Sequence, residues 1–239
     1  MSGTPRLGLA ANLGQFGLLV LVNAFVGAMV GLERSILPAI AEKEFHLAAR
    51  AAILSFIVVF GLAKAATNYF AGSVSDRWGR KPVLIAGWLL AIPVPFLLMS
   101  ADSWNAILAA NALLGASQGL TWSTTVIMKI DLVGPNQRGL AMGLNEFAGY
   151  LAVALSALAT GYVAARYGLR PQPFYLGVGF VVLGLLLSTL AVHETRGHAV
   201  HEAATASEAE SDRPASREIF LRTSFTDRNL SAVSQAGLV

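Results

Sequence analysis

Six long apolar stretches, separated by short charged or turn-forming segments, dominate this sequence. They occupy roughly residues 14–37, 50–74, 82–100, 104–128, 139–164 and 174–193. A helix needs about 20 mostly apolar residues to cross the hydrocarbon core of a bilayer, and soluble proteins rarely contain several such stretches in succession. The sequence therefore predicts an all-α membrane protein with six transmembrane helices. Their expected boundaries include Pro38, Ser75–Asp76 and Gly134–Asn136.

Composition excludes several other classes of protein. Hydrophobic residues make up 55% of the chain and charged residues only 13%, which is about half the charged share of soluble domains. The net charge of +3, without a basic stripe, argues against nucleic acid as a partner. Cysteine is absent, which rules out disulfides, thiolate metal sites and cysteine nucleophiles. The first apolar stretch is too long for a cleaved signal peptide.

Glycines recur at four-residue spacing in three of the stretches. Small residues at this spacing let two helices approach closely in lipid, where packing drives association. We expect close helix contacts at Gly27 and Gly31, Gly115 and Gly119, and Gly139 and Gly143.

Two loops share a pattern that indicates an internal repeat. Residues 72–82 align with residues 161–171 without a gap, and glycine, valine, arginine, glycine and proline are identical at five positions. One copy follows the second stretch and the other follows the fifth, so the two lie on opposite membrane faces. This arrangement is typical of a 3+3 inverted repeat, as found in secondary transporters. The alternative is chance similarity between short glycine-rich loops.

Lysine and arginine in the short loops predict the orientation. With a cytoplasmic amino terminus, one side collects seven of them and the other side collects four. The first set is Arg6, Arg77, Arg80, Lys81, Lys129, Arg138 and Arg196, and the second is Lys43, Arg50, Arg166 and Arg170. The bias favours a multi-pass protein of the cell (inner or plasma) membrane with both ends in the cytoplasm.

The first of the two loops, residues 72–81, combines glycines with clustered charges. It reads Gly-Ser-Val-Ser-Asp-Arg-Trp-Gly-Arg-Lys. We expect Gly72 to permit close helix packing, Gly79 to allow a tight turn, and Asp76 to accept hydrogen bonds from a helix amino terminus. Anionic lipid headgroups or cytoplasmic carboxylates can pair with the basic side chains. These are Arg77, Arg80 and Lys81.

This loop resembles the signature of the major facilitator superfamily, Gly-x3-Asp-Arg-x-Gly-Arg-Lys, at every defining position and in the expected loop. The alternative is an ordinary positively charged loop. The resemblance covers about residues 10–200 and implies the amino-terminal six-helix half of a transporter. Such a protein would be a secondary active transporter that moves a small solute by alternating access, and it would use no cofactor.

The resemblance also implies a network of gating residues. Sugar-type members are similar in placing an acid and an arginine seven residues apart after the fourth span, here Asp131 and Arg138, and an acid beyond the sixth, here Glu194. In such relatives these groups form cytoplasmic ion pairs with the loop, so the resemblance extends to Asp76, Arg77 and Arg80. Asp131 replaces the usual glutamate, and the proline-rich surroundings of Glu194 are missing. The proline–glycine signature of drug antiporters is absent from the fifth stretch.

Polar residues inside the stretches are costly in lipid and are candidates for the transport path. They are Asn23, Lys64, Asn68, Asn111, Gln118 and Glu146. Hydrogen bonding between helices is the structural alternative for Asn23 and Gln118. Lys64 and Glu146 lie at similar depth, where they can neutralise one another or Glu146 can carry a coupling proton. The resemblance does not place the second and fifth spans side by side, so a direct pair is not expected.

Other polar groups have simpler interpretations. Glu33 and Arg34 are expected near the outer end of the first span, as snorkelling side chains or a local ion pair. The hydroxyls between Ser117 and Thr125 can bond a solute or their own helix. Three histidines after the sixth stretch, His193, His198 and His201, are expected to be flexible, and no metal site is predicted.

An enzyme is not expected. Intramembrane serine proteases resemble residues 115–117 in their nucleophile motif, but Gln118 stands where they have glycine. The nearest histidine, His193, lies at a helix end while Ser117 lies at mid-depth, which is incompatible with a catalytic contact of ~3 Å.

The last part of the chain differs from the rest. Residues 197–218 are rich in Ala, Ser and charge and predict a flexible cytoplasmic linker, and residues 219–239 resemble the approach to a seventh span. We therefore divide the chain into a bundle, residues 1–196, and a tail, residues 197–239. The expected partners are a small-molecule substrate, possible coupling protons, lipids, and a missing carboxy-terminal half or a second copy. The alternative is a non-transporting six-span scaffold or a dimerising half-transporter.

Overall fold

The computed structural model describes residues 6–206 and 216–236, and within these ranges the chain forms helices and connecting segments without strands. The prediction of an all-α protein is therefore confirmed. The chain divides into two compact units, residues 1–201 and 202–239, which are described separately.

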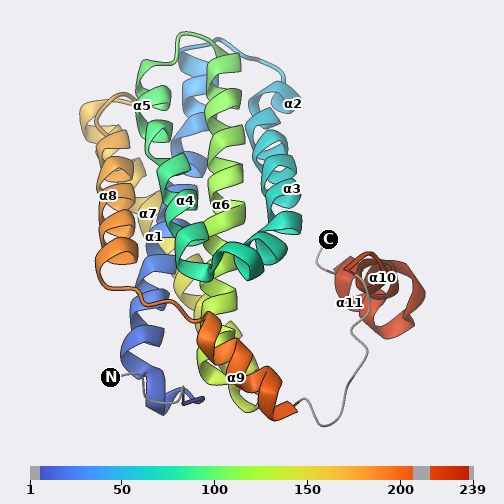
Figure 1. Cartoon of the computed structure of the whole chain (residues 1–239). Helices are drawn as coiled ribbons and strands as arrows, with labels where there is room; N and C mark the ends of the chain where they lie inside the picture. Colours follow the sequence, from blue (N-terminus) through green and yellow to red (C-terminus); the bar gives the residue numbers. More distant parts are fainter. Residues whose placement is uncertain (1–5, 207–215, 237–239) are drawn as a thin grey trace. The chain divides into compact units, whose positions relative to one another are not determined.

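Six long helical segments form the first unit, and each coincides with one of the apolar stretches (Figure 1). They are α1 (Leu13–Lys43), α3 (Ser55–Trp78), the pair α4 (Arg80–Ala91) and α5 (Pro93–Ser100), α6 (Trp104–Val133), α7 (Arg138–Tyr167) and α8 (Phe174–Leu190). Shorter elements are η1 (Ala10–Asn12), α2 (Arg50–Ile53), η2 (Pro135–Gln137) and α9 (Arg196–Ala206).

Two of the expected helix boundaries are wrong. α1 continues through Pro38 to Lys43, and α3 continues through Ser75 and Asp76 to Trp78. A proline removes one backbone donor, and the buried neighbours of Pro38 keep the helix packed in the core. α3 ends where Gly79 adopts a φ of +97°, a conformation that favours glycine.

Four helical segments are long and apolar enough to cross a membrane among the described residues. They are Ala10–Lys43, Ser55–Trp78, Arg80–Ser100 and Pro135–Tyr167. α8 is apolar but has only 17 residues, and α6 carries Asn, Gln, Ser and Thr side chains along its length, which make it less apolar. Six helical segments are thus present, while six membrane crossings remain a prediction.

The same pattern of helix contacts appears twice, once around α1 and once around α6. α1 packs along α7 as α3 packs along α6, and α8 contacts α1 as α4 contacts α6. Exchanging the first three segments with the last three maps each pair onto the other. The same exchange brings Gly79 onto Gly168, whose φ values are +97° and +98°. This pattern of contacts agrees with two similar halves of three segments each, while their inverted arrangement in a membrane remains a prediction.

Glycines form the closest contacts in both pairs. A Cβ at Gly27 or Gly31 would overlap the backbone of α7, and one at Gly115 would overlap the backbone of α3. At Gly119 it would lie 2.6 Å from Cβ of Thr67. Two of the three expected glycine pairs therefore bring helices together. The expectation for Gly139 and Gly143 is wrong for this bundle, because a Cβ there would meet no atom within 4 Å.

The tail contains more regular structure than expected. The segment predicted as a linker begins with helix α9, whose first N–H groups bond to the Glu194 carboxylate. The second unit contains α10 (Ser216–Leu221), a π-helical turn at Arg222–Thr226, and α11 (Arg228–Ala236), where Asp227 accepts the backbone N–H groups of Asn229 and Leu230. Residues 207–215 and 237–239 lie outside the described part, so the linker and the seventh span remain predictions.

Gly31→Ala tests the close approach of α1 to α7. The added methyl group has no room, and we expect a loss of roughly 1–3 kcal/mol in the free energy of unfolding. Gly143→Ala is the matched control, because its methyl group has room and should add up to about 1 kcal/mol of helix stability. Denaturant unfolding in detergent, followed by circular dichroism, measures both. Equal effects of the two changes would contradict the glycine contact.

Candidate functional site

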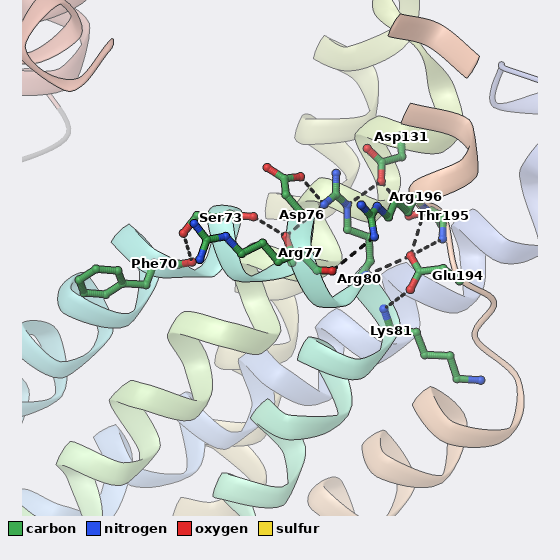
Figure 2. Close-up of polar contacts among 12 residues, drawn as sticks. Phe70, Ser73, Asp76, Arg77, Arg80, Lys81, Asp131, Glu194, Thr195 and Arg196 are labelled. Carbon is green, nitrogen blue, oxygen red and sulfur yellow. Dashed lines mark hydrogen bonds and ion pairs between the residues drawn. The ribbon is translucent and has the colours of Figure 1, made fainter. Parts of the chain in front are cut away.

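A cluster of charged residues gathers where the end of α3, the start of α4, the last turn of α6 and the segment after α8 meet (Figure 2). We call it the Arg80 cluster, and it comprises Ser75, Asp76, Arg80, Asp131 and Thr195. The turn at Gly79 reverses the chain direction between α3 and α4, which brings the Arg80 side chain back over α3.

Arg80 holds the cluster together. Its guanidinium donates to Asp131 Oδ2 from Nε at 3.2 Å, and to Asp76 Oδ1 from Nη1 at 2.5 Å. Nη1 also lies 3.3 Å from Ser75 Oγ, and Thr195 Oγ1 donates to Asp131 Oδ2 at 2.8 Å. Arg80 and Asp131 are each only 6% exposed. Removal of either partner would leave a buried charge uncompensated, which typically costs about 3–5 kcal/mol.

Glu194 caps two helices at once. Its Oε1 accepts the backbone N–H groups of Arg80, Thr195 and Arg196 at 2.9–3.0 Å, and its Oε2 accepts that of Lys81 at 3.0 Å. Partial burial acts to raise the pKa of Glu194, but these four donors outweigh it and hold the pKa below its ordinary value of 4.5. The carboxylate thus satisfies free N–H groups at the amino termini of α4 and α9.

The residues of the predicted loop have different roles in the structure. Glu194 caps two helices of this bundle, whereas Asp76 is 68% exposed and bonds to Arg80. The helix that Asp76 is expected to cap belongs to a second half, so this capping remains a prediction. Gly79 forms the turn, and a Cβ there would lie 2.7 Å from Glu194 Oε2. The expectation for Gly72 is wrong for this bundle, since a Cβ there would meet nothing within 4 Å.

The remaining basic residues of the predicted network lie around the cluster. Lys81 Nζ donates to the Thr189 carbonyl at 2.8 Å, near the carboxyl end of α8, where a cation is favourable. Arg77 is exposed, and its side chain extends toward Phe70, away from Arg80 (Figure 2). Arg138 is exposed at the first residue of α7, while Asp131 bonds Arg80 and Thr195.

A second site is a cavity of about 200 Å³ between four helices, which we call the chamber. Its walls come from α1, α3, α6 and α7, and they combine charged with aromatic side chains. The lining residues are Val30, Arg34, Phe60, Lys64, Trp122, Glu146, Tyr150 and Val153. Lys64 and Glu146, which the sequence singled out, therefore face the same space.

A buried lysine lies close to the chamber carboxylate. The prediction of Lys129 in a loop is wrong, because this residue is 1% exposed within α6. Its Nζ donates to Asn145 Oδ1 and, at 3.3 Å, to the Leu19 carbonyl. Asn145 Nδ2 donates to Glu146 Oε1 at 2.7 Å, and Trp122 Nε1 donates to the same oxygen at 3.3 Å. Lys129 is thus connected to the chamber carboxylate through one amide.

A helical period could have revealed Lys129. Gln118, Trp122, Thr125 and Lys129 follow one another at intervals of four, three and four residues, which places them on one face of a helix. The lysine was instead read as a loop charge because the apolar run before it ends at residue 128. α6 continues to Val133 and ends only at Gly134, whose φ is +69°.

The other transport-path candidates bond to the helices around them. Asn23 Nδ2 donates to the Asn145 carbonyl at 3.1 Å, and its Oδ1 accepts from Thr125 Oγ1 at 3.0 Å. Gln118 Nε2 donates to the Val26 carbonyl at 2.7 Å. These side chains join helices, which matches the structural alternative for both.

Two further candidates, Asn68 and Asn111, lie outside the chamber lining. Asn68 Oδ1 accepts from Ser123 Oγ at 2.7 Å, across the contact between α3 and α6. Asn111 Nδ2 donates to the Ile107 carbonyl of its own helix at 3.0 Å. The hydrogen bond of Asn111 is buried and that of Asn68 is exposed, and their place in a transport path remains a prediction.

Glu33 differs from its expected position. It is 2% exposed, and its Oε1 has no hydrogen-bond partner, so the snorkelling interpretation is wrong for this residue. Glu33 lines a small cavity with Asn111, and Arg34 lines both this cavity and the adjoining chamber.

Neither the metal nor the protease alternative gains support from the described residues. No group of three His, Asp or Glu side chains among them could hold a metal ion. Ser117 Oγ donates to the Gly87 carbonyl at 2.8 Å, inside the contact between α6 and α4, and His193 is exposed.

Glu194→Gln tests the double cap. A carboxamide presents an NH₂ group to one of the N–H donors, so we expect the start of α9 to loosen at neutral pH. In the parent chain the lowered pKa makes the contribution of Glu194 complete above pH 4.5 and lost as the pH falls through the lower folded value. A nitroxide on Val200→Cys reports this as increased mobility, and no native cysteine interferes.

The control for this experiment is Glu42→Gln, an exposed acid in α1. It should leave both the mobility at pH 7 and its rise in acid unchanged. A Glu194→Gln chain that is as rigid as the parent at pH 7 would show that the carboxylate does not cap α9.

The chain is similar to known transport proteins in sequence and fold. The sequence profile described as Major Facilitator Superfamily matches residues 17–237. Multidrug resistance protein MdtG of Serratia proteamaculans (strain 568) is 31% identical over 142 residues, which cover 59% of this chain and 34% of that protein. MdtG of Escherichia fergusonii is 30% identical over 140 residues, which cover 58% and 33%. The chain thus spans about a third of the length of these curated relatives.

Solved structures show the same fold. A crystal structure of the peptide transporter POT in complex with alafosfalin superposes with a TM-score of 0.66 at 18% identity, and it covers 93% of this chain and 45% of that chain. The same transporter in complex with sulfate gives a TM-score of 0.65 at 16% identity, with 93% and 49% covered. With the matching profile over most of its length, the chain belongs to the Major Facilitator Superfamily, a family of multi-pass membrane transport proteins.

Proposed function

We propose that this chain is one six-helix half of a secondary active transporter that moves a small solute across the cell (inner or plasma) membrane by alternating access. The observation that carries the proposal is the chamber, where Lys64 and Glu146 face a common cavity between α1, α3, α6 and α7. Charged side chains at such a depth are costly and mark solute or ion paths. Both ends of the chain lie in the cytoplasm in this proposal, following the lysine and arginine bias.

A second bundle would complete the transporter. α3 and α7 border the chamber, yet few of their residues are buried. In the most apolar 18-residue part of each helix, the buried share is 11% for α3 and 17% for α7, against 50% for α1. Large apolar side chains stand exposed on both, among them Phe70 and Tyr150. The chain also covers less than half of each peptide transporter structure. A carboxy-terminal half, or a second copy, packed on α3 and α7 would cover these faces, and membrane lipids surround the rest.

The Arg80 cluster serves as a gate in this proposal. It ties α3, α4, α6 and the segment after α8 together at one end of the bundle through buried bonds. Because a buried ion pair loses much of its energy when one partner moves away, the cluster favours one arrangement of these elements until the whole set separates. Asp76 is the exposed member, which leaves it accessible to a second bundle.

Glu146 is the residue that we assign to a coupling proton. It is the carboxylate in the chamber lining, and two N–H donors reach its Oε1. A proton on this carboxylate would compete with these donors and weaken the link through Asn145 to Lys129. Proton uptake at Glu146 would thereby change the contact between α6 and α7, which is the kind of change that alternating access requires.

Glu146→Gln tests both the transport and its coupling. The chain is reconstituted in liposomes, alone and together with the carboxy-terminal half of an MdtG relative, and a trapped pH dye reports proton flux when a panel of drugs and peptides is added. We expect solute-driven proton flux in the parent and at least a tenfold loss in Glu146→Gln, because the amide cannot take up the proton. Glu42→Gln should behave as the parent.

Two outcomes would contradict the proposal in different ways. Full solute flux with full pH dependence in Glu146→Gln would remove the proton from this residue. A folded chain that moves no solute, alone or with the second half, would favour a non-transporting membrane scaffold.

A further inference from the structure

The charges around the chamber do not balance. Arg34 and Lys64 line it as cations, and Glu146 lines it as the acid. Glu146 is already shared, because Asn145 connects it to the buried amino group of Lys129. Glu33, the other acid of this region, lines an adjoining small cavity that shares Val30, Arg34 and Phe60 with the chamber, but Glu33 itself is not part of the chamber lining. Within the described residues, neither Arg34 nor Lys64 has a carboxylate within ion-pair distance.

Aromatic rings hold Lys64 in place without neutralising it. Its Nζ lies 4.7 Å from the centroid of the Trp122 ring and 5.8 Å from that of Phe60. Such contacts orient an ammonium group, but they accept none of its hydrogen bonds and carry no formal negative charge. Tyr150 packs edge-on against Trp122 with a centroid distance of 6.1 Å. The chamber therefore presents two cations beside aromatic walls.

We propose that the chamber binds a small organic anion with a flat apolar part, its carboxylate, phosphonate or other anionic group placed between Arg34 and Lys64 and its apolar part against Trp122 and Tyr150. This inference rests on the proposed function, since it names the class of solute. An anion there supplies the negative charge that the two side chains lack, through charge-assisted hydrogen bonds. The aromatic walls bind the apolar part by burying its surface.

The positive charges of Arg34 and Lys64 also determine which ligands bind weakly in the chamber. A cationic analogue would bring a third positive charge beside Arg34 and Lys64, and only Glu146 could compensate it. Like charges in close contact disfavour a wrong ligand by several kcal/mol. Neutral analogues keep the aromatic contact but leave both cations unpaired.

A matched set of ligands tests the proposal on the purified full chain in lipid nanodiscs. Benzoate, benzamide and benzylamine share one ring and carry a negative, a neutral and a positive substituent. Isothermal titration calorimetry should show benzoate binding at least about tenfold more tightly than benzamide, and benzylamine more weakly than both.

Variants assign the preference to the chamber. Lys64→Gln should lower the affinity for benzoate to that for benzamide and leave benzamide binding unchanged, which also shows that the site remains folded. Lys64→Arg should keep the preference. Lys43→Gln, which removes an exposed lysine at the end of α1, should have no effect.

Three outcomes would overturn the anion proposal. Benzoate could bind no more tightly than benzamide, its preference could persist in Lys64→Gln, or none of the three ligands could bind. The liposome flux measurement is independent of these results, so a chain that moves solutes but binds benzylamine or benzamide best retains the proposed function and loses only the anionic substrate class.

Discussion

The buried amino group of Lys129 imposes the strongest constraint on this bundle. An ammonium group at 1% exposure needs acceptors from its surroundings, and here they come from α1 and α7. α6 therefore keeps a fixed register against both helices. Because the Asn145 amide that bonds to Lys129 also donates to Glu146, the same constraint positions the chamber carboxylate. Loss of Lys129 would remove the bonds that fix α6 against α1 and α7, and it would remove the positive charge nearest to Asn145 and Glu146.

Close backbone contacts make this arrangement possible. Gly27 and Gly31 let α1 approach α7, and Gly115 and Gly119 let α6 approach α3, so the chamber has walls from all four helices. At the other polar site the constraint is different. The Arg80 cluster contains a buried ion pair and an exposed acid, and it joins helix ends rather than helix faces. The bundle thus combines polar contacts between helix faces with a charged cluster that joins helix ends.

Much of the fold follows from the sequence because the bilayer restricts the choice of structure so strongly. Long apolar runs predict helices, and their positions agree with the six helical segments. The glycine turn at Gly79 follows from its motif, since a short loop between two long helices needs a positive φ. Features that depend on one neighbour were not accessible in this way. Whether Gly72 or Gly143 packs closely depends on the helix beside it, which periodicity does not identify.

The errors at charged residues share one physical cause. The expectation that a charge marks solvent is wrong for Lys129 and Glu33, which are buried. Asp76 is exposed as expected, although it lies within α3 rather than at its end. A buried charge is tolerated when specific acceptors surround it, and those acceptors come from helices distant in sequence. Glu194 was recognised through its position in the family, but its role as a cap for two helices became visible only in three dimensions.

A double-mutant cycle between Lys129 and Glu146 tests this account most directly. Lys129→Met, Glu146→Gln and the double variant are compared with the parent by denaturant unfolding in detergent. If the two charges stabilise each other through Asn145, the double variant loses less free energy than the two single changes together, with a coupling energy of about 1–3 kcal/mol. Effects that add to within about 0.5 kcal/mol would contradict the link between the buried lysine and the chamber.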